Sequence, residues 1–278
     1  LGRPGYSFII LLVNSVTAFR WVGTSLGSVY RSTDNCATWQ TSLNKRSFSL
    51  IIVGNNIFTG TYETGVYVSS NNGINWTQTS LNNKTVKSFA VSGNYIFAGT
   101  SFSGIYISTN DGISWTQTSM TNNYFRCFAV DGDNIFAGGG GVHFTSNNGS
   151  NWTNLGLNQE VYSILIVGNT VFAGTWSDLY ISNDYGINWV RQNICFPNVC
   201  SIVKLENNIF IGGSEGVFLT TNNGLSWKTK NQGFGYNPPT LNTLLIANNY
   251  IFAGDVGSTW RRSLSEITGI QNISTEIP

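Results

Sequence analysis

Short runs of alternating apolar and polar residues, each ended by a turn rich in glycine and asparagine, recur along nearly the whole chain. A first block, read at 88–100 as S-F-A-V-S-G-N-Y-I-F-A-G-T, holds two apolar runs divided by a turn, which is a hairpin signal. A second block, read at 103–115 as S-G-I-Y-I-S-T-N-D-G-I-S-W, holds an alternating strand, a polar turn and a tryptophan that opens the next strand. Each pair of blocks therefore predicts four short antiparallel strands, and no helical period appears.

These blocks repeat at a nearly fixed distance. The tryptophans of the second block are Trp39, Trp76, Trp115, Trp152, Trp189 and Trp227, so the period is 37 to 39 residues. A period of this length is typical of repeat architectures, and four-stranded units that repeat radially form a β-propeller. The sequence therefore predicts an all-β, seven-bladed β-propeller of four-stranded antiparallel blades, at about 8–42, 47–80, 86–119, 125–156, 161–193, 199–231 and 241–264.

The polar turn follows the template Ser/Thr-x-Asn/Asp-x-Gly-x-x-Trp, except that Cys36 stands at the glycine position of the first copy. An Asn or Asp side chain can bond the backbone two residues on, and glycine supplies a positive φ that other residues resist. The tryptophan adds a large apolar area that holds the turn against the sheet. We therefore interpret the motif as scaffold. Its Asn/Asp positions are Asp34, Asn71, Asn110, Asn147, Asp184 and Asn222.

This template resembles the Asp-box, or bacterial-neuraminidase repeat, of sialidase-like and photosystem-assembly-factor-like β-propellers. The resemblance covers residues from about 20 to 264 and includes six copies in register. It implies the propeller fold with Asp-box turns. It says little about function, because many unrelated activities occur on this scaffold.

The end of the chain departs from the repeat. The seventh unit lacks the turn, so its outer strand is expected from 266–272, from the extreme N-terminus, or not at all. We expect a single propeller domain over 1–264 and a tail or linker over 265–278 that could complete the last blade. The tail resembles the linker that joins such propellers to a type IX secretion sorting domain. That resemblance implies a bacterial protein that is secreted or displayed on the cell surface.

Composition narrows the classes of partner. Charged residues make up 10% of the chain, against about 25% in typical globular proteins, and the net charge is +1. No basic run appears, which argues against nucleic acid and anionic membranes. The apolar run Phe8 to Val13 is too short to span a bilayer. No P-loop or dinucleotide motif occurs, so we expect no cofactor. Separately, we expect the protein to be a monomer.

Equivalent positions in the repeats can be compared with one another, and those that differ are freer to serve function. They lie in loops that enter the innermost strand and in loops between the second and third strands, on the face opposite the repeated turns. Aromatic rings beside charged groups there can stack on sugars and bond hydroxyls, which predicts a module that binds glycan or surface polymer through the central opening. A structural surface protein is an alternative. The predicted binding residues are Lys87, Tyr124, Arg126, Tyr162, Trp176, Asp178, Glu215 and Asp255.

A second alternative is a glycoside hydrolase or related hydrolase. Such enzymes need two carboxylates roughly 5 to 10 Å apart, and the candidate pairs are Glu215 with Asp255 and Glu160 with Asp178. The arginine triad that the sialidase resemblance would imply looks absent. The single histidine, His143, occupies a position that is aromatic in the other repeats, so we expect a structural histidine and no metal site.

Cysteine usage gives one further expectation. Cys195 and Cys200 close the short loop C-F-P-N-V-C before the sixth unit. Export would place them in an oxidising compartment, and a turn at 197–198 would permit the distance that a disulfide needs. The sequence therefore predicts a disulfide between them, with Cys36 and Cys127 free.

Overall fold

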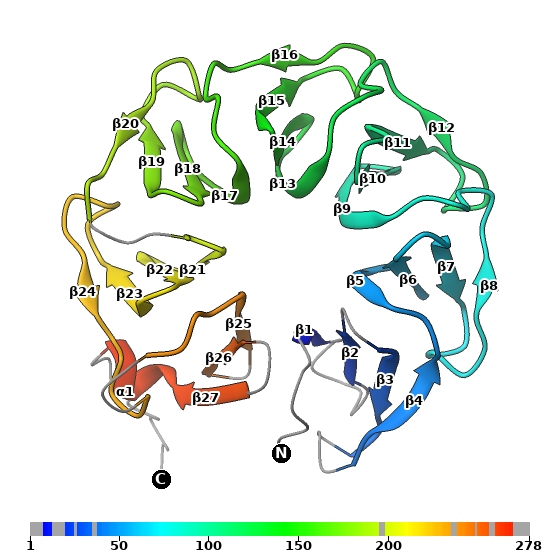
Figure 1. Ribbon diagram of the computed structural model, residues 1–278, viewed down its shortest axis with the longest axis horizontal. Coiled ribbons are helices and arrows are strands. Elements are labelled where there is room, and N and C mark those ends of the chain that lie inside the picture. Colours follow the sequence, from blue (N-terminus) through cyan, green and yellow to red (C-terminus); the bar gives the residue numbers. More distant parts are fainter. Residues whose placement is uncertain are drawn as a thin grey trace, which may run out of the picture.

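The computed structural model describes residues 8–12, 20–24, 27–34, 38–194, 198–234, 238–247, 249–255 and 259–268. These residues form seven antiparallel sheets, six of four strands and one of three. Figure 1 shows the sheets in a ring, with the first strand of each sheet nearest the ring axis and the last strand outside. The strands of each sheet pair in sequence order, so each sheet is built from one continuous part of the chain. The all-β prediction is confirmed.

The first four sheets have the following strands. Sheet one holds β1 (Phe8–Leu12), β2 (Arg20–Thr24), β3 (Val29–Ser32) and β4 (Gln40–Leu43). Sheet two holds β5 (Ser47–Val53), β6 (Asn56–Thr61), β7 (Gly65–Ser69) and β8 (Thr77–Gln78). Sheet three holds β9 (Val86–Ser92), β10 (Tyr95–Thr100), β11 (Ile105–Ser108) and β12 (Thr116–Gln117). Sheet four holds β13 (Phe125–Asp131), β14 (Asn134–Gly139), β15 (Gly141–Thr145) and β16 (Thr153–Asn154).

The remaining three sheets continue the order. Sheet five holds β17 (Val161–Val167), β18 (Thr170–Thr175), β19 (Leu179–Ser182) and β20 (Val190–Arg191). Sheet six holds β21 (Ser201–Leu205), β22 (Asn208–Gly213), β23 (Gly216–Thr220) and β24 (Lys228–Thr229). Sheet seven holds β25 (Thr243–Ala247), β26 (Tyr250–Gly254) and β27 (Thr259–Ser263), followed by the short helix α1 (Leu264–Thr268).

The core lies between neighbouring sheets. A phenylalanine on the second strand of five sheets is fully buried, at Phe58, Phe97, Phe136, Phe172 and Phe210. The turn glycine of the following sheet packs against this ring: a Cβ at Gly112 would overlap the Phe58 ring, and one at Gly149 would lie 3.1 Å from Phe97. Each repeated turn is therefore fastened to the preceding sheet, and only glycine leaves room for that approach.

Hydrogen bonds within the repeated turns are the same from sheet to sheet. In sheet two the Ser69 hydroxyl donates to Asn71 Oδ1 at 3.0 Å and accepts from the Gly73 N–H at 2.9 Å. Asn71 Oδ1 also accepts the Asn75 N–H at 2.9 Å. Equivalent acceptor bonds occur at Asp34, Asn110, Asn147, Asp184 and Asn222. The turn polar groups thus satisfy one another, which supports their interpretation as scaffold.

Turn tryptophans add to this packing. Trp115 contacts the cluster of Phe58 and Ile96 between sheets two and three. Its Nε1 donates to the Gly112 carbonyl at 3.1 Å, and Trp76 Nε1 donates to Ser42 Oγ of the preceding sheet at 2.9 Å. Burying aromatic side chains of this size contributes about 1.5–3 kcal/mol or more each. These rings therefore hold neighbouring sheets together.

Sheet seven narrows the three alternatives for the end of the last unit. Its fourth strand is missing from the described residues, and α1 follows β27 directly. Leu264 and Ile267 of this helix are buried against Leu241 and Leu244. Glu266 is therefore helical and does not begin an outer strand; residues 269–278 lie outside the described part of the chain. The N-terminal strand β1 instead forms the inner strand of sheet one. No helix in the described residues is long and apolar enough to cross a membrane.

Candidate binding site on the inner strands

Four inner strands share a β-bulge near their first residue. The ladder shifts register between Ser47 and Ser49, opposite Gly99 and Thr100, between Phe125 and Cys127, and between Val161 and Ser163. The residues left without a ladder partner are Phe48, Lys87, Arg126 and Tyr162. A bulge re-aims the side chain of its extra residue. These four bulge residues lie at the end of the sheets opposite the repeated turns, because the turns follow the third strand.

The bulge residues and their loop neighbours contact one another across sheets. Lys87 Nζ lies 3.2 Å from the centroid of the Phe48 ring. The Arg126 guanidinium lies 4.9 Å from the Tyr162 ring and 5.4 Å from the Tyr124 ring. A cation over an aromatic face is stabilised by about 0.5–2 kcal/mol, depending on desolvation. Three of the predicted binding residues, Tyr124, Arg126 and Tyr162, therefore form one cluster.

Glu160 completes this cluster. Arg126 Nη2 lies 2.7 Å from Glu160 Oε1, and the two side chains are 39% and 37% exposed. An ion pair this exposed contributes at most about 1 kcal/mol to stability, so its main effect is to orient the guanidinium. The sequence offered Glu160 only as an acid or base in the enzyme alternative, whereas the structure makes it the partner of Arg126.

A cavity of about 320 Å³ lies beside the cluster; we call it the inner-strand cavity. It is lined by Lys87, Ser101, Phe102, Tyr124, Arg126 and Glu160. Its volume is at the lower end of the range of roughly 300–1,000 Å³ that ligand sites show. Three predicted residues, Lys87, Tyr124 and Arg126, therefore meet in one concave site.

One exposed aromatic ring lines the inner-strand cavity, and another packs on the cluster beside it. Phe102, in the loop between β10 and β11, is 77% exposed and packs 5.8 Å from Tyr124. Trp176, in the equivalent loop between β18 and β19, is 63% exposed and packs 6.4 Å from Tyr162. Large exposed apolar side chains gathered around a cavity mark interaction sites. The predicted Trp176 lies on this surface.

Burial and charge perturb the titration of these groups. Burial, followed by the nearby charges of Arg126 and Arg46, lowers the pKa of Lys87 to about 8. Burial, followed by the charge of Glu160, raises the pKa of Tyr162 to about 12, and burial also raises the pKa of Tyr124. Perturbed groups that gather in a cavity are characteristic of functional sites.

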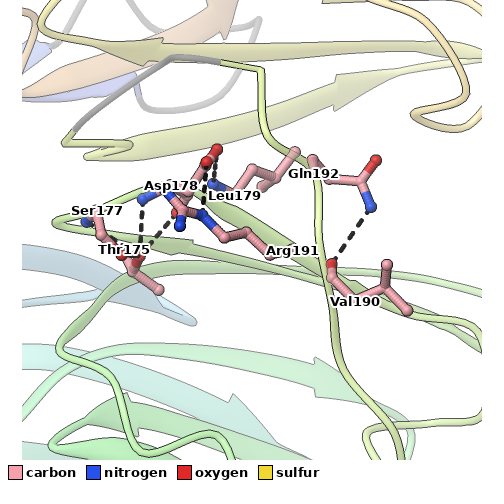
Figure 2. A network of polar contacts seen from close by, with 7 residues as sticks. All are labelled: Thr175, Ser177, Asp178, Leu179, Val190, Arg191 and Gln192. Carbon is pink, nitrogen blue, oxygen red and sulfur yellow. Dashed lines mark hydrogen bonds and ion pairs between the residues drawn. The ribbon is translucent and has the colours of Figure 1, made fainter.

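Asp178 does not belong to this site. It is 1% exposed, its Oδ1 accepts the Leu179 N–H at 2.9 Å, and its Oδ2 pairs with Arg191 Nε at 3.0 Å. Figure 2 shows this network, which ties the loop before β19 to the outer strand β20. The interpretation of Asp178 as a binding or acid–base residue is therefore corrected: its carboxylate holds sheet five together.

Glu215 and Asp255 lie on later sheets. Glu215 is exposed between β22 and β23, and its backbone carbonyl accepts a bond from Asn231 Nδ2 at 2.7 Å. Asp255 follows β26 and is half-buried. Neither is among the lining residues of the inner-strand cavity. Their role stays a prediction.

A second cavity, of about 430 Å³, lies at the opposite end of sheets three and four. It is lined by Tyr95, Ile107, Gln117, Thr118, Ser119, Asn147, Asn148, Gly149 and Ser150. Although it is larger, its lining has no charged side chain and includes the turn residues 147–150, whose polar groups already bond one another. We therefore place the candidate site at the inner-strand cavity.

The histidine and the cysteines that the sequence singled out do not belong to the inner-strand cavity, or lie outside the described residues. His143 is buried, with its ring 5.5 Å from Phe125, and burial lowers its pKa. The described residues hold no group of three or more His, Cys, Asp or Glu side chains that could bind a metal. Cys127 and Cys200 are free thiols, and Cys200 Sγ lies 3.2 Å from Asn198 Oδ1. Cys195 and Cys36 lie outside the described residues. Because Cys200 carries a free thiol, the structure contradicts the predicted disulfide between Cys195 and Cys200.

Sequence reasoning missed part of the site. Phe48, Ser101 and Phe102 were not among the predicted binding residues, yet they contact or line the inner-strand cavity. Phe48 stands at the position of Lys87 in the preceding repeat, so the comparison of repeats already places it in the variable column without selecting it as a binding residue. The signal for Phe102 is its place beside Trp176 in the alignment of loops.

Comparison with known proteins identifies the fold. No family model and no curated protein matches the chain. The structure is similar to that of an ancestral GH74 enzyme, with a TM-score of 0.76 and 18% identity over 94% of this chain and 45% of that one. It is similar to YCF48 bound to D1 peptide, with a TM-score of 0.70 and 15% identity over 94% of both chains. It is also similar to the extracellular domain of BT4673 from B. thetaiotaomicron, with a TM-score of 0.75 and 15% identity over 94% of this chain and 40% of that one.

These neighbours are β-propeller proteins, and the predicted β-propeller fold is confirmed. The chain spans less than half the length of the GH74 enzyme and of the BT4673 domain. At such low identities the likeness concerns the fold alone, since one scaffold hosts many activities.

Proposed function

We propose that the chain is a seven-bladed propeller, with one blade per sheet and a single domain over 1–264, that binds a carbohydrate polymer at the inner-strand cavity. One observation carries the proposal: the cavity is lined by Lys87, Arg126 and the exposed ring of Phe102. The exposed ring of Trp176 continues this surface, because it packs on Tyr162, which contacts Arg126. Flat, exposed rings suit stacking on sugar faces, while guanidinium, ammonium and hydroxyl groups suit hydrogen bonds to sugar oxygens.

The test is a glycan array probed with wild-type protein and two alanine variants. Trp176→Ala should weaken binding at least about tenfold without unfolding, because the ring is largely exposed and truncating it removes ligand contact area. The matched control is Leu225→Ala, since Leu225 is 88% exposed at the opposite end of the sheets. Loss of binding in the Leu225 variant with full binding in the Trp176 variant would contradict the proposal.

The GH74 likeness motivates one alternative, a glycoside hydrolase. Because Asp178 is buried and paired with Arg191, the pair of Glu160 and Asp178 is a poor candidate. The remaining carboxylates are Glu160 in the inner-strand cavity and the pair of Glu215 and Asp255. Hydrolysis of a polysaccharide that Glu215→Gln or Asp255→Asn abolishes, in protein with unchanged binding, would establish the enzyme.

The proposed setting is outside the cell. One structural neighbour is an extracellular domain, and the 265–278 tail resembles a type IX secretion linker.

A further inference from the structure

The inner-strand cavity has more positive than negative charge. Lys87 and Arg126 line it, and Arg46 is close enough to affect the titration of Lys87. Among the described residues that line it, Glu160 is the one carboxylate, and it is paired with Arg126. The chain as a whole has a net charge of only +1. The local excess of cations is therefore a property of this site.

Lys87 has no anionic partner among the described residues. It forms no ion pair with a described carboxylate, and its Nζ lies over the face of Phe48. Burial and two arginine charges destabilise its charged form. An anion brought into the cavity would reverse both effects, since it would neutralise the repulsion and replace the lost water.

We propose that the ligand of this site is an acidic polysaccharide, with one carboxylate or sulfate bound between Lys87 and Arg126 and neighbouring sugar rings stacked on Phe102 and Trp176. This inference rests on the proposed carbohydrate-binding function and specifies its ligand class. Guanidinium and ammonium groups form strong, charge-assisted hydrogen bonds to such anions.

The arrangement of the rings favours a polymer over a small anion. Phe102 belongs to sheet three and Trp176 to sheet five, and the cavity lies beside sheets three and four. A ligand that contacts both rings and the cavity must extend beyond a single sugar. We therefore expect longer oligosaccharides to bind more tightly than monosaccharides with the same acidic group.

The first experiment compares polymers that differ only in charge. Polygalacturonate is tested against its fully methyl-esterified form, and dextran sulfate against dextran, with polyglutamate as a non-carbohydrate polyanion. We expect at least one acidic polysaccharide to bind about tenfold or more tightly than its neutral partner, with affinity falling as salt rises. The two pairs distinguish carboxylate from sulfate.

Other outcomes separate this inference from the proposed function. Equal binding of neutral and acidic forms overturns the acidic ligand but leaves carbohydrate binding intact. Polyglutamate binding as tight as that of the best acidic polysaccharide overturns both, because the partner would then be an acidic protein. Binding of no polysaccharide also overturns both.

A second experiment uses the titration of Lys87. Its charged neighbours are Arg46 before β5, Arg126 on β13 and Glu160 before β17, and the raised pKa values of Tyr124 and Tyr162 keep those rings neutral at moderately alkaline pH. Because the pKa of free Lys87 is about 8, raising the pH from about 7 to about 9 should weaken acidic polymer binding by up to about tenfold.

Two variants assign that pH dependence. Lys87→Arg should bind the acidic polymer with a flat profile over the same range, because arginine keeps its charge. Lys87→Met should bind at least about tenfold more weakly at neutral pH while melting at the wild-type temperature. Unchanged affinity in the Lys87→Met protein overturns the inference.

Discussion

In sheets two to five, the two ends of the sheet differ in how they use their side chains. At the repeated turns, the same residues make the same bonds in sheet after sheet, as Ser69, Asn71 and Gly73 show. At the inner-strand bulges, the same backbone position holds Phe48, Lys87, Arg126 or Tyr162. The turn uses its polar groups internally, whereas the bulge releases one side chain from the ladder. Positions that hold the same residue in successive sheets therefore belong to the scaffold, and the position that holds a different residue in each sheet belongs to the candidate site.

The largest expected effect is a loss of stability on truncating a turn tryptophan, which truncation of Trp176 should not cause. Trp115→Ala removes a ring that packs between sheets two and three, and truncation of a buried tryptophan costs about 3–5 kcal/mol. Because Trp115 is only half-buried, we expect about 3 kcal/mol, measured by denaturant unfolding, with ligand affinity of the folded protein unchanged. Trp176→Ala is the counterpart and should lose affinity with little change in stability. An unchanged stability of the Trp115 variant would break the distinction between the two ends.

Alanine substitutions at two glycines can measure how much the packing of the turn on the preceding sheet contributes to stability. Gly112 has φ +77° and faces the Phe58 ring, whereas Gly93 has φ +55° and no atom within 4 Å of a built Cβ. Alanine at either position should cost about 1–2 kcal/mol for the left-handed backbone. Gly112→Ala should cost more than Gly93→Ala because Phe58 must also move. Equal losses in thermal unfolding would show that the turn does not pack on the preceding sheet.

Two ion pairs should respond in opposite ways. Arg126→Ala breaks an exposed pair in the site, so binding should fall at least about tenfold while stability changes by less than about 1 kcal/mol. Arg191→Ala leaves the buried Asp178 carboxylate without its cation, so stability should fall while binding persists. Calorimetric titration and thermal unfolding of both variants check this. Reversed effects would show that Asp178 and Arg191 belong to the functional site.

The smallest effect concerns His143, on the third strand of sheet four. Burial lowers its pKa, and its Nδ1 has no hydrogen-bond partner in the described part of the chain. Below a pH of about 6.5 the unfolded chain binds a proton that the folded chain resists, so stability is full above that pH and falls as the solution becomes acidic. His143→Phe, which copies Phe218 of sheet six, should flatten this loss. An acid unfolding curve that the substitution leaves unchanged would contradict the assignment.

The fold was accessible to sequence reasoning because local and global signals agree. A turn glycine, a buried phenylalanine and a turn tryptophan recur together in the second to sixth repeats, and each has a physical task in the packing of neighbouring sheets. The column of Lys87, Arg126 and Tyr162 was also found, since repeats can be compared position by position. The β-bulge that exposes these side chains was not predicted, because a bulge is a property of strand pairing that the alternation of apolar and polar residues does not reveal.

The errors came from contacts that join distant positions. Asp178 looked like a surface carboxylate, but Arg191 lies 13 residues further on, and the register of β19 and β20 brings them together. The sequence left open whether the tail supplies a fourth strand, and the burial of Leu264 and Ile267 in a short helix depends on packing against sheet seven that the sequence does not reveal. Sequence proximity gives no information about such pairings unless the register is known.

The order of strands within the sheets also has a consequence for folding kinetics. Every ladder joins strands that are neighbours in sequence, and such local contacts favour rapid folding. The contact of β1 with β25 instead joins the two ends of the chain. Closing that loop costs conformational entropy before it gains any contact. We expect individual sheets to form early and ring closure to be the slow last step.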